Sequence, residues 1–139
     1  MKAILIFFMF FSLFSFGQNI KKHQWENRVI LIISDNKNTS EFQNQVQVLK
    51  DKSSELIDRK LVIYQIIEKS YSFNFDENWI LSSKLYSKFN AKKNPFKIIL
   101  TGLDGGIKLS QTEILSAKKL FAIIDGMPMR KRELIKNKK

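Results

Sequence analysis

The sequence predicts an α/β domain, and three features carry that prediction. Residues 29–33 (VILII) and 60–67 (KLVIYQII) are compact apolar runs rich in β-branched side chains, and a stretch with helical spacing separates them. Residues 94–107 (NPFKIILTGLDGGI) hold a third apolar run, an Asp-Gly-Gly break and the start of a fourth run. An Asp-Gly pair between apolar runs is a strong hairpin signal, because glycine adopts the positive φ that the turn requires.

The first 17 residues have the layout of a cleavable signal peptide. A basic head precedes an apolar run of 14 residues that closes on Ser-Phe-Gly. Because a transmembrane helix needs roughly 18–20 residues, we expect cleavage after Gly17 and no membrane span in the mature chain. An uncleaved N-terminal anchor is the alternative. The predicted domain then occupies residues 18–136, residues 137–139 form a disordered tail, and the protein is periplasmic or secreted.

The composition narrows the chemistry that this chain can perform. The chain has no cysteine, which excludes thiol redox reactions, cysteine nucleophiles and thiolate metal sites. The formal charge is +11, with scattered lysines and a dense basic stretch only at residues 130–139. Such a surface either attracts a polyanion or anionic membrane, or is simply solvated. Because an exported protein meets little nucleic acid, we favour the solvated surface and expect no nucleic-acid partner.

The first half of the predicted domain is a βαβ unit. Residues 29–33 are apolar on both faces, which is typical of a central strand that helices cover on each side. Residues 40–58 carry apolar side chains at helical spacing and are predicted as a single helix. Residues 60–67 then form a second strand parallel to the first, with a right-handed crossover.

The second half contains a helix, the hairpin and a closing helix. Residues 68–78 are predicted as a loop whose alternating aromatic side chains form either a strand extension or a lid on the core, and residues 79–89 as a helix. Pro95 starts the hairpin, since proline donates no N–H. The last helix begins at Ser116, and Pro128 stops it or opens a short final helix. The resulting order, β-α-β-α-β-β-α, is that of the thioredoxin fold, a three-layer sandwich.

Two stretches resemble a bacterial family called domain of unknown function 4174. They are residues 96–108 (FKIILTGLDGGIK) and 120–130 (LFAIIDGMPMR), and the resemblance extends from Trp25 to Glu133. The motif residues in these stretches are Asp104, Gly105, Gly106, Lys108, Asp125, Met127, Pro128, Met129 and Arg130. The family is regarded as thioredoxin-like and is similar to domains of vertebrate extracellular matrix proteins of the sushi-repeat and equarin type. Leu103 stands where the family usually has lysine, so a ligand contact made by that lysine would be lost here.

The thioredoxin resemblance also implies where a ligand binds. In thioredoxins the catalytic cysteines follow the first strand of a βαβ unit, at the place of residues 35–40 here, which hold none. A cis proline before the hairpin shapes the thioredoxin peptide groove, and Pro95 matches the position of that proline. The resemblance therefore raises the expected frequency of a cis Asn94–Pro95 bond well above the ~5–6% found for X-Pro bonds generally. If the hairpin strand runs antiparallel to the first strand, Pro95 lies within about 15 Å of the Asp35 loop. We therefore predict that a protein or peptide binds at Asp35, Asn36, Lys37, Asn94 and Pro95.

His23 and three aspartates could form functional sites, but each also has a purely structural interpretation. His23 is the single histidine and has no partner at motif spacing, which indicates a surface or half-packed residue. Asp35, Asp104 and Asp125 form a site for a hard cation if they converge. Otherwise the first two are turn residues and Asp125 is a surface residue near a helix end, the interpretation that we favour.

Two classes of function remain open from the sequence. In the first, the protein is a non-catalytic, cysteine-free, thioredoxin-like exported domain without a cofactor, and it binds an extracytoplasmic protein or peptide. In the second, it is a carboxylate- or metal-dependent extracytoplasmic enzyme. The second class needs acidic side chains that converge in a pocket.

Overall fold

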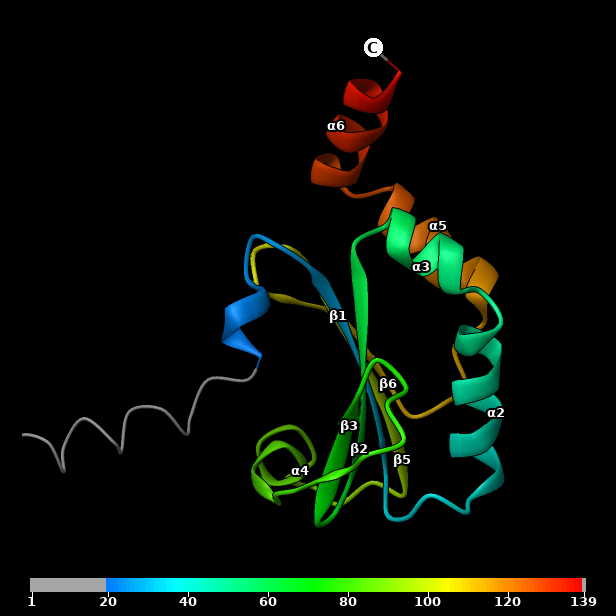
Figure 1. Cartoon of the computed structure of the whole chain (residues 1–139), viewed down its shortest axis with the longest axis vertical. Helices are drawn as coiled ribbons and strands as arrows, with labels where there is room; N and C mark the ends of the chain where they lie inside the picture. The colour runs from blue at the N-terminus through cyan, green and yellow to red at the C-terminus, as the bar shows by residue number, and fades with distance from the viewer. Residues whose placement is uncertain (1–19, 139) are drawn as a thin grey trace, which may run out of the picture.

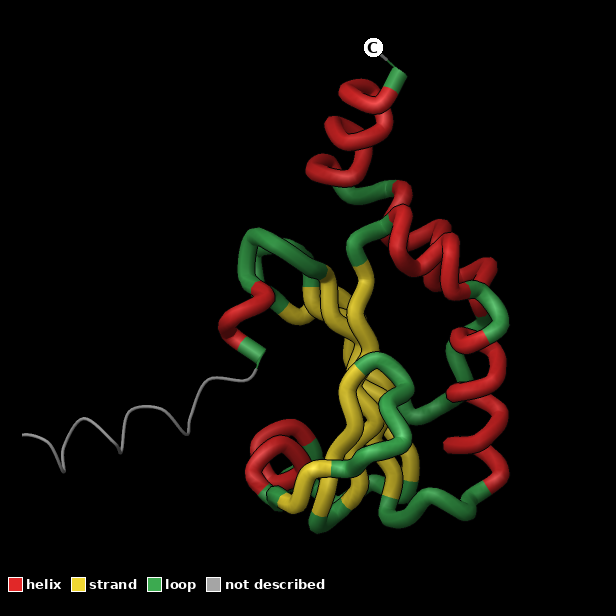
Figure 2. Tube along the Cα trace, in the orientation of Figure 1, coloured by secondary structure: helices red, strands yellow, loops and turns green. Residues whose placement is uncertain are grey.

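The computed structural model describes residues 20–138, so the predicted signal peptide and Lys139 lie outside the described residues. This part of the chain forms a six-stranded mixed sheet and five α-helices, with a short 3₁₀-helix before them (Figures 1 and 2). The elements are η2 (Lys21–His23), β1 (Arg28–Ser34), α2 (Ser40–Lys50), α3 (Ser53–Asp58), β2 (Leu61–Ile67), β3 (Ser70–Phe73), β4 (Ile80–Leu81), α4 (Lys84–Phe89), β5 (Phe96–Thr101), β6 (Ile107–Gln111), α5 (Ala117–Asp125) and α6 (Pro128–Asn137). Within residues 20–138, no helix has the length and apolar character needed to cross a bilayer.

The sheet is built around β1. The strand order is β4-β3-β2-β1-β5-β6, in which β1 and β2 are parallel and every other neighbouring pair is antiparallel. The predicted βαβ unit and hairpin are both confirmed by these pairings. All seven residues of β1 are buried, which agrees with a strand that is apolar on both faces.

Helices cover both faces of the sheet, and the alternation of side chains along β1 divides the core into two layers. Ile30 and Ile32 belong to the cluster that α2, α3 and α5 cover, whereas Leu31 and Ile33 belong to the cluster on the α4 side. Figure 1 shows the same division, with α2, α3 and α5 on one side of the strands and α4 on the other. The predicted elements place Ile99 on a central strand and Ile124 on the helix that covers it. Both are buried, but on opposite faces of the sheet.

The predicted helix over residues 40–58 is two helices. It breaks at Asp51 and Lys52, between α2 and α3. The hydroxyl of Ser53 donates a hydrogen bond to the carbonyl of Lys50 at 2.8 Å, which satisfies one acceptor that the end of α2 leaves free. The prediction of a single helix was wrong because helical spacing of apolar residues continues across a short break.

The prediction for residues 79–89 was wrong in its first half. Ile80 and Leu81 form the short edge strand β4, which pairs with Ser70 and Tyr71 of β3. β3 (Ser70–Phe73) lies within residues 68–78, which were predicted as a loop, so the strand alternative for that segment is confirmed. Leu81 has the spacing of a helix residue, yet it is 87% exposed, since it belongs to an edge strand. Short apolar segments do not distinguish a strand from a helix by periodicity alone.

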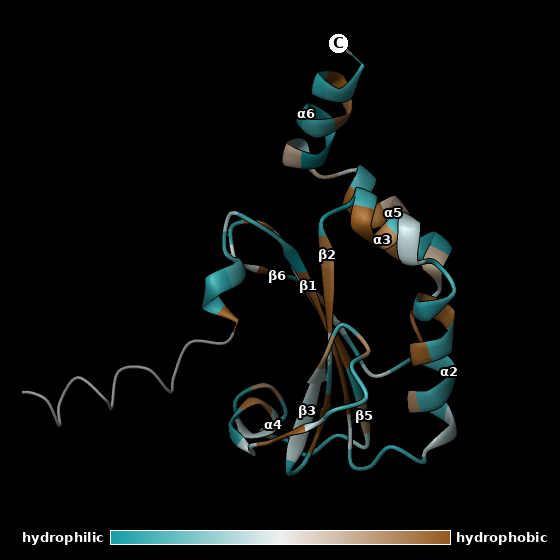
Figure 3. Cartoon of the chain, in the orientation of Figure 1, coloured by the Kyte–Doolittle hydropathy of each residue, from teal (hydrophilic) through white to brown (hydrophobic). Residues whose placement is uncertain are grey.

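The start of α5 and the start of α6 agree with the signals predicted at Ser116 and Pro128. The hydroxyl of Ser116 accepts a hydrogen bond from the backbone N–H of Lys119 at 3.2 Å and so caps α5. Pro128 is the first residue of α6, where its missing N–H has no cost. Figure 3 shows that α6 is mostly hydrophilic, so apolar packing alone does not hold it against the rest of the fold.

Candidate functional site

The loop after β1 and the residues before β5 meet at one end of the sheet. The backbone N–H of Asp35 donates to the carbonyl of Pro95 at 3.3 Å. The adjacent pair Ser34 and Phe96 is the last register pair of the antiparallel β1·β5 ladder. The predicted proximity of Pro95 and Asp35 is therefore confirmed, and we call this region the β1-end site.

The Asn94–Pro95 bond is trans, and no cis peptide bond occurs between residues 20 and 138. The thioredoxin resemblance raised the possibility of a cis bond here without deciding it, and this chain does not have one. The chain enters β5 through a local clamp, in which the Asn90 side chain donates to the Asn94 carbonyl at 2.9 Å and accepts from its N–H at 3.0 Å. Because the backbone N–H and carbonyl of Asn94 are paired internally, they are not free to pair with an extended peptide.

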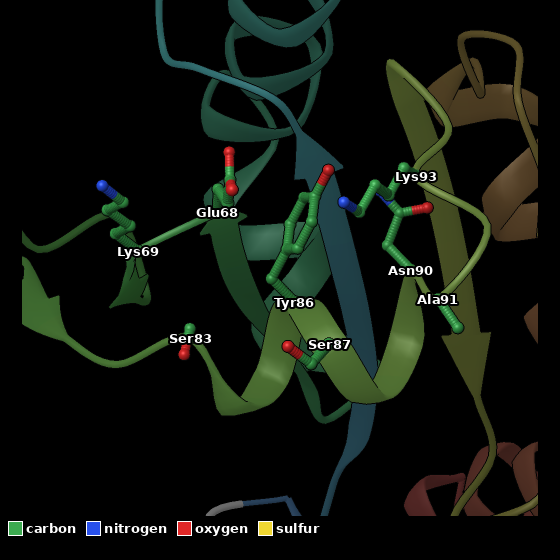
Figure 4. A pocket seen from close by; sticks show the side chains of 8 residues that line it. All are labelled: Glu68, Lys69, Ser83, Tyr86, Ser87, Asn90, Ala91 and Lys93. Carbon is green, nitrogen blue, oxygen red and sulfur yellow. The ribbon is translucent and has the colours of Figure 1, made fainter.

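A pocket of about 710 Å³ lies beside the β1-end site, and we call it the Tyr86 pocket. It is lined by Glu68, Lys69, Ser83, Tyr86, Ser87, Asn90, Ala91 and Lys93 (Figure 4). The Tyr86 hydroxyl donates to the Asp35 carboxylate at 3.0 Å. Burial, and then this hydrogen bond, raise the pKa of Tyr86, so the hydroxyl stays protonated. The Tyr86 side chain therefore links the pocket to the Asp35 loop.

The other two loop residues of the predicted site have local roles. The Asn36 side chain accepts from the N–H of Asn38 at 2.8 Å, which is an Asx turn. The Lys37 ammonium lies 4.6 Å from the centre of the Trp79 ring, a cation–π contact. Lys37 and Trp79 also line a different hollow, beside α2. The structure thus unites Asp35, Asn94 and Pro95 but directs Lys37 away from the Tyr86 pocket.

The three aspartates that we considered as a cation site do not converge. Asp35 faces Tyr86 at the carboxyl end of β1, whereas Asp104 lies in the β5–β6 turn and Asp125 ends α5. Within residues 20–138, no group of three or more His, Cys, Asp or Glu side chains is placed to hold a metal ion. The candidate cation site is therefore not formed by these residues.

His23 is buried, contrary to the prediction of a surface or half-packed residue. Its Nε2 lies 2.8 Å from the Tyr64 hydroxyl, its Nδ1 lies 3.3 Å from the side-chain oxygen of Asn27, and its ring stacks on Phe73. Burial lowers the pKa of His23 and raises that of Tyr64 to about 12. These contacts hold the N-terminal segment on the sheet and leave His23 no evident catalytic task.

The two motif stretches meet in a second pocket, of about 530 Å³, which we call the motif pocket. Its lining comprises Arg28, Gly102, Leu103, Asp104, Lys108, Ile123, Gly126, Met127, Pro128 and Met129. The β5–β6 turn forms one wall, and the α5–α6 joint forms another. Sequence reasoning found the motifs but not their convergence, which tertiary packing alone produces.

The β5–β6 turn is built around the Asp104 carboxylate. One carboxylate oxygen accepts from the N–H of Gly106 at 2.9 Å, and the other lies 3.0 Å from the Lys108 ammonium. These two groups lower the pKa of Asp104. Gly105 has φ +83°, so this position of the turn favours glycine.

The motif residue Arg130 is buried within an ion network, although we expected the basic C-terminal stretch to be solvated. Its side chain is 2% exposed and lies 2.6 Å from the Asp58 carboxylate, 3.2 Å from Asp125 and 3.3 Å from Glu133. Arg59 also pairs with Asp125 at 2.9 Å. Burial alone would raise the pKa of Asp125, but the hydrogen bonds from the two arginines outweigh it and lower this pKa. Asp125 is therefore an ion-pair residue rather than a simple surface residue.

Arg28 extends the network to the start of β1. The residue is 0% exposed, and its guanidinium donates to both Glu133 oxygens, at 3.2 and 3.4 Å, and to the Arg59 carbonyl at 2.9 Å. Its Nε–H is buried and has no hydrogen-bond partner among the described residues. Sequence reasoning missed the pairing of Arg28 with Glu133, since only the three-residue spacing of Arg130 and Glu133 was a local signal.

These features define a cysteine-free α/β domain with a pocket at each end of its central strand. A sequence model of the family described as Domain of unknown function (DUF4174) matches residues 19–133, and the chain belongs to this family. Among curated proteins, none matches the chain.

Proposed function

We propose that this chain is a non-catalytic exported domain that binds an extracytoplasmic protein or peptide at the β1-end site. The observation that carries the proposal is the direct meeting of Asp35 and Pro95 beside the Tyr86 pocket. Ligands of open α/β sheets bind beyond the carboxyl ends of the strands, and Asp35 follows the carboxyl end of β1.

The proposal includes a thioredoxin-like arrangement for the core of the sheet. The strands β2-β1-β5-β6 contain one parallel pair followed by antiparallel neighbours, and the helices α2 and α3 connect the parallel strands. This arrangement supports the comparison with thioredoxins, in which the corresponding end of the sheet binds peptides. β3 and β4 then extend the opposite edge of the core.

The lining of the Tyr86 pocket favours a polar, acidic peptide. Ser83, Ser87 and Asn90 supply hydroxyl and amide groups that both donate and accept hydrogen bonds. Among the lining residues, Lys69 and Lys93 provide two cations against the anion Glu68, while the Asp35 carboxylate beside the pocket already accepts a hydrogen bond from Tyr86. Figure 4 shows Glu68 and Lys93 on opposite sides of the Tyr86 ring. An acidic side chain of a partner would therefore gain charge complementarity here.

A selection from a displayed random peptide library tests this proposal. The full chain serves as bait, the enriched peptide is titrated by fluorescence anisotropy, and its site is mapped by amide chemical shifts. We expect acidic peptides to be enriched and the shifts to centre on Asp35, Tyr86 and Asn94. Enrichment of no peptide, or shifts centred on the motif pocket, would overturn the proposal.

Charge-reversed variants then separate local recognition from general electrostatics. Lys69→Glu with Lys93→Glu should weaken binding by about tenfold or more, because both lysines line the pocket. Lys118→Glu with Lys131→Glu changes the net charge equally on the exposed surfaces of α5 and α6, and it should leave the affinity nearly unchanged. Equal losses in both variants would refute a site in the Tyr86 pocket. Melting temperatures of all variants establish that each remains folded.

A further inference from the structure

We propose that the motif pocket is a second site, which binds a small aliphatic carboxylate. It lies at the opposite end of β1 from the β1-end site, since Arg28 begins the strand and Asp35 follows it. Seven residues of a strand extend about 20 Å. The inference therefore neither requires nor repeats the proposed peptide site.

The walls of the motif pocket are suited to an aliphatic chain. Its apolar lining residues are Leu103, Ile123, Met127, Pro128 and Met129. A volume of about 530 Å³ falls in the range of roughly 300–1,000 Å³ that small-molecule pockets occupy. Methionine side chains are unbranched and polarisable, so Met127 and Met129 can adapt to a flexible chain. Leu103 adds a buried apolar side chain to this wall.

Lys108 gives the pocket an accessible cation. Its side chain is 37% exposed, and its ammonium forms an ion pair with Asp104 at 3.0 Å. An ammonium group has three donors, and the bond to Asp104 uses one of them. A carboxylate at the pocket mouth would accept a charge-assisted hydrogen bond from Lys108.

Arg28 supplies a second donor that lacks an acceptor. Its other guanidinium nitrogens are bonded to Glu133 and to the Arg59 carbonyl, but its buried Nε–H has no partner within the described part of the chain. A buried donor without an acceptor is unfavourable. Because Arg28 lines the pocket, a ligand oxygen that reaches its Nε–H would satisfy this group. Two cationic donors beside apolar walls are complementary to a carboxylate with an aliphatic tail.

Titrations with octanoate and octanol test the charge requirement directly. The full chain, labelled with ¹³C at the methionine methyl groups, reports binding through Met127 and Met129, which line the pocket. We expect octanoate to shift both methyl resonances in a saturable manner, and octanol to bind at least about tenfold more weakly. Equal affinity for the two ligands, or no shift at Met127 and Met129, would overturn the proposal. Binding of N-acetyl-leucine without binding of octanoate would also overturn it, in favour of a peptide C-terminus.

Two substitutions at the Asp104–Lys108 ion pair should change the affinity for octanoate in opposite directions. Lys108→Met keeps the aliphatic stem but removes the ammonium, and it should weaken octanoate binding by about tenfold. Asp104→Asn releases Lys108 and keeps an oxygen for the Gly106 N–H, so it should strengthen octanoate binding several-fold. Lys118→Met, on the exposed surface of α5, is the matched control and should change nothing. Neither pocket substitution should alter octanol binding, and parallel changes for both ligands would indicate a merely structural effect.

Discussion

Replacing Glu133 with alanine removes the carboxylate that lies against a fully buried arginine. Arg28 is 0% exposed and donates to both Glu133 oxygens, at 3.2 and 3.4 Å, while Arg130 reaches the same carboxylate at 3.3 Å. Removing one partner of a buried ion pair typically costs about 3–5 kcal/mol, because it leaves the other charge buried and unpaired. Domains are stable by only about 5–15 kcal/mol, so this loss would be a large share of the total.

Urea unfolding at neutral pH measures the effect of Glu133→Ala. With an m-value of about 2 kcal/mol per molar, the midpoint should fall by about 1.5–2.5 M. The matched control Glu113→Ala removes an exposed carboxylate and should change stability by no more than about 0.5 kcal/mol. The paired replacement Arg28→Met with Glu133→Leu should recover most of the loss, since it removes both charges. A cost below about 1 kcal/mol for Glu133→Ala would refute the reasoning, because it would mean that Arg28 does not need this counter-ion.

Three further predictions concern pH, the core and the N-terminus. Burial lowers the pKa of His23 below 6.5 in the folded state, so the contribution of His23 to stability is complete above pH 6.5 and declines as the pH falls below that value. Thermal melts from pH 7.5 to 5.5 should show this decline in the native chain but not in His23→Gln. The same decline in both proteins would contradict the prediction. Ile99→Ala and Ile124→Ala should each lower the free energy of unfolding in urea by about 2–5 kcal/mol, although the residues lie on opposite faces of the sheet. A loss below about 0.5 kcal/mol is typical of a surface position and would contradict the burial of that residue. The exported protein should begin at Gln18, and an intact mass that still includes residues 1–17 would exclude cleavage.

The elements that the sequence predicted correctly are those whose signal is local and strong. β1 and β2 are apolar along their length because helices cover both faces of the sheet, and few other elements have that composition. The β5–β6 hairpin was predictable because Asp104 and Gly105 have turn chemistry that does not depend on tertiary contacts. By contrast, Ile80 and Leu81 become an edge strand only because β3 is beside them, and their own spacing does not indicate it.

For the candidate sites too, the sequence predicted some contacts and missed others. Chain order and strand direction were enough to place Pro95 beside Asp35. They could not give the Tyr86 hydrogen bond to Asp35, since it joins side chains 51 positions apart that no spacing rule relates. The pairing of Arg28 with Glu133 joins residues 105 positions apart, and no spacing rule relates them.

The motif residues near the C-terminus therefore have two connected tasks. Asp125 and Arg130 hold the α5–α6 joint through ion pairs with Arg59 and Asp58, and Met127, Pro128 and Met129, which lie between them, line the motif pocket. Because α6 is mostly hydrophilic, these ion pairs and the contact of Glu133 with Arg28 are what fix its start against the sheet. Of these charged residues only Arg28 lines the pocket, so the geometry of the pocket wall depends largely on charges outside its lining. A ligand of the motif pocket would bind to the folded chain alone, so it should in turn stabilise this network against unfolding.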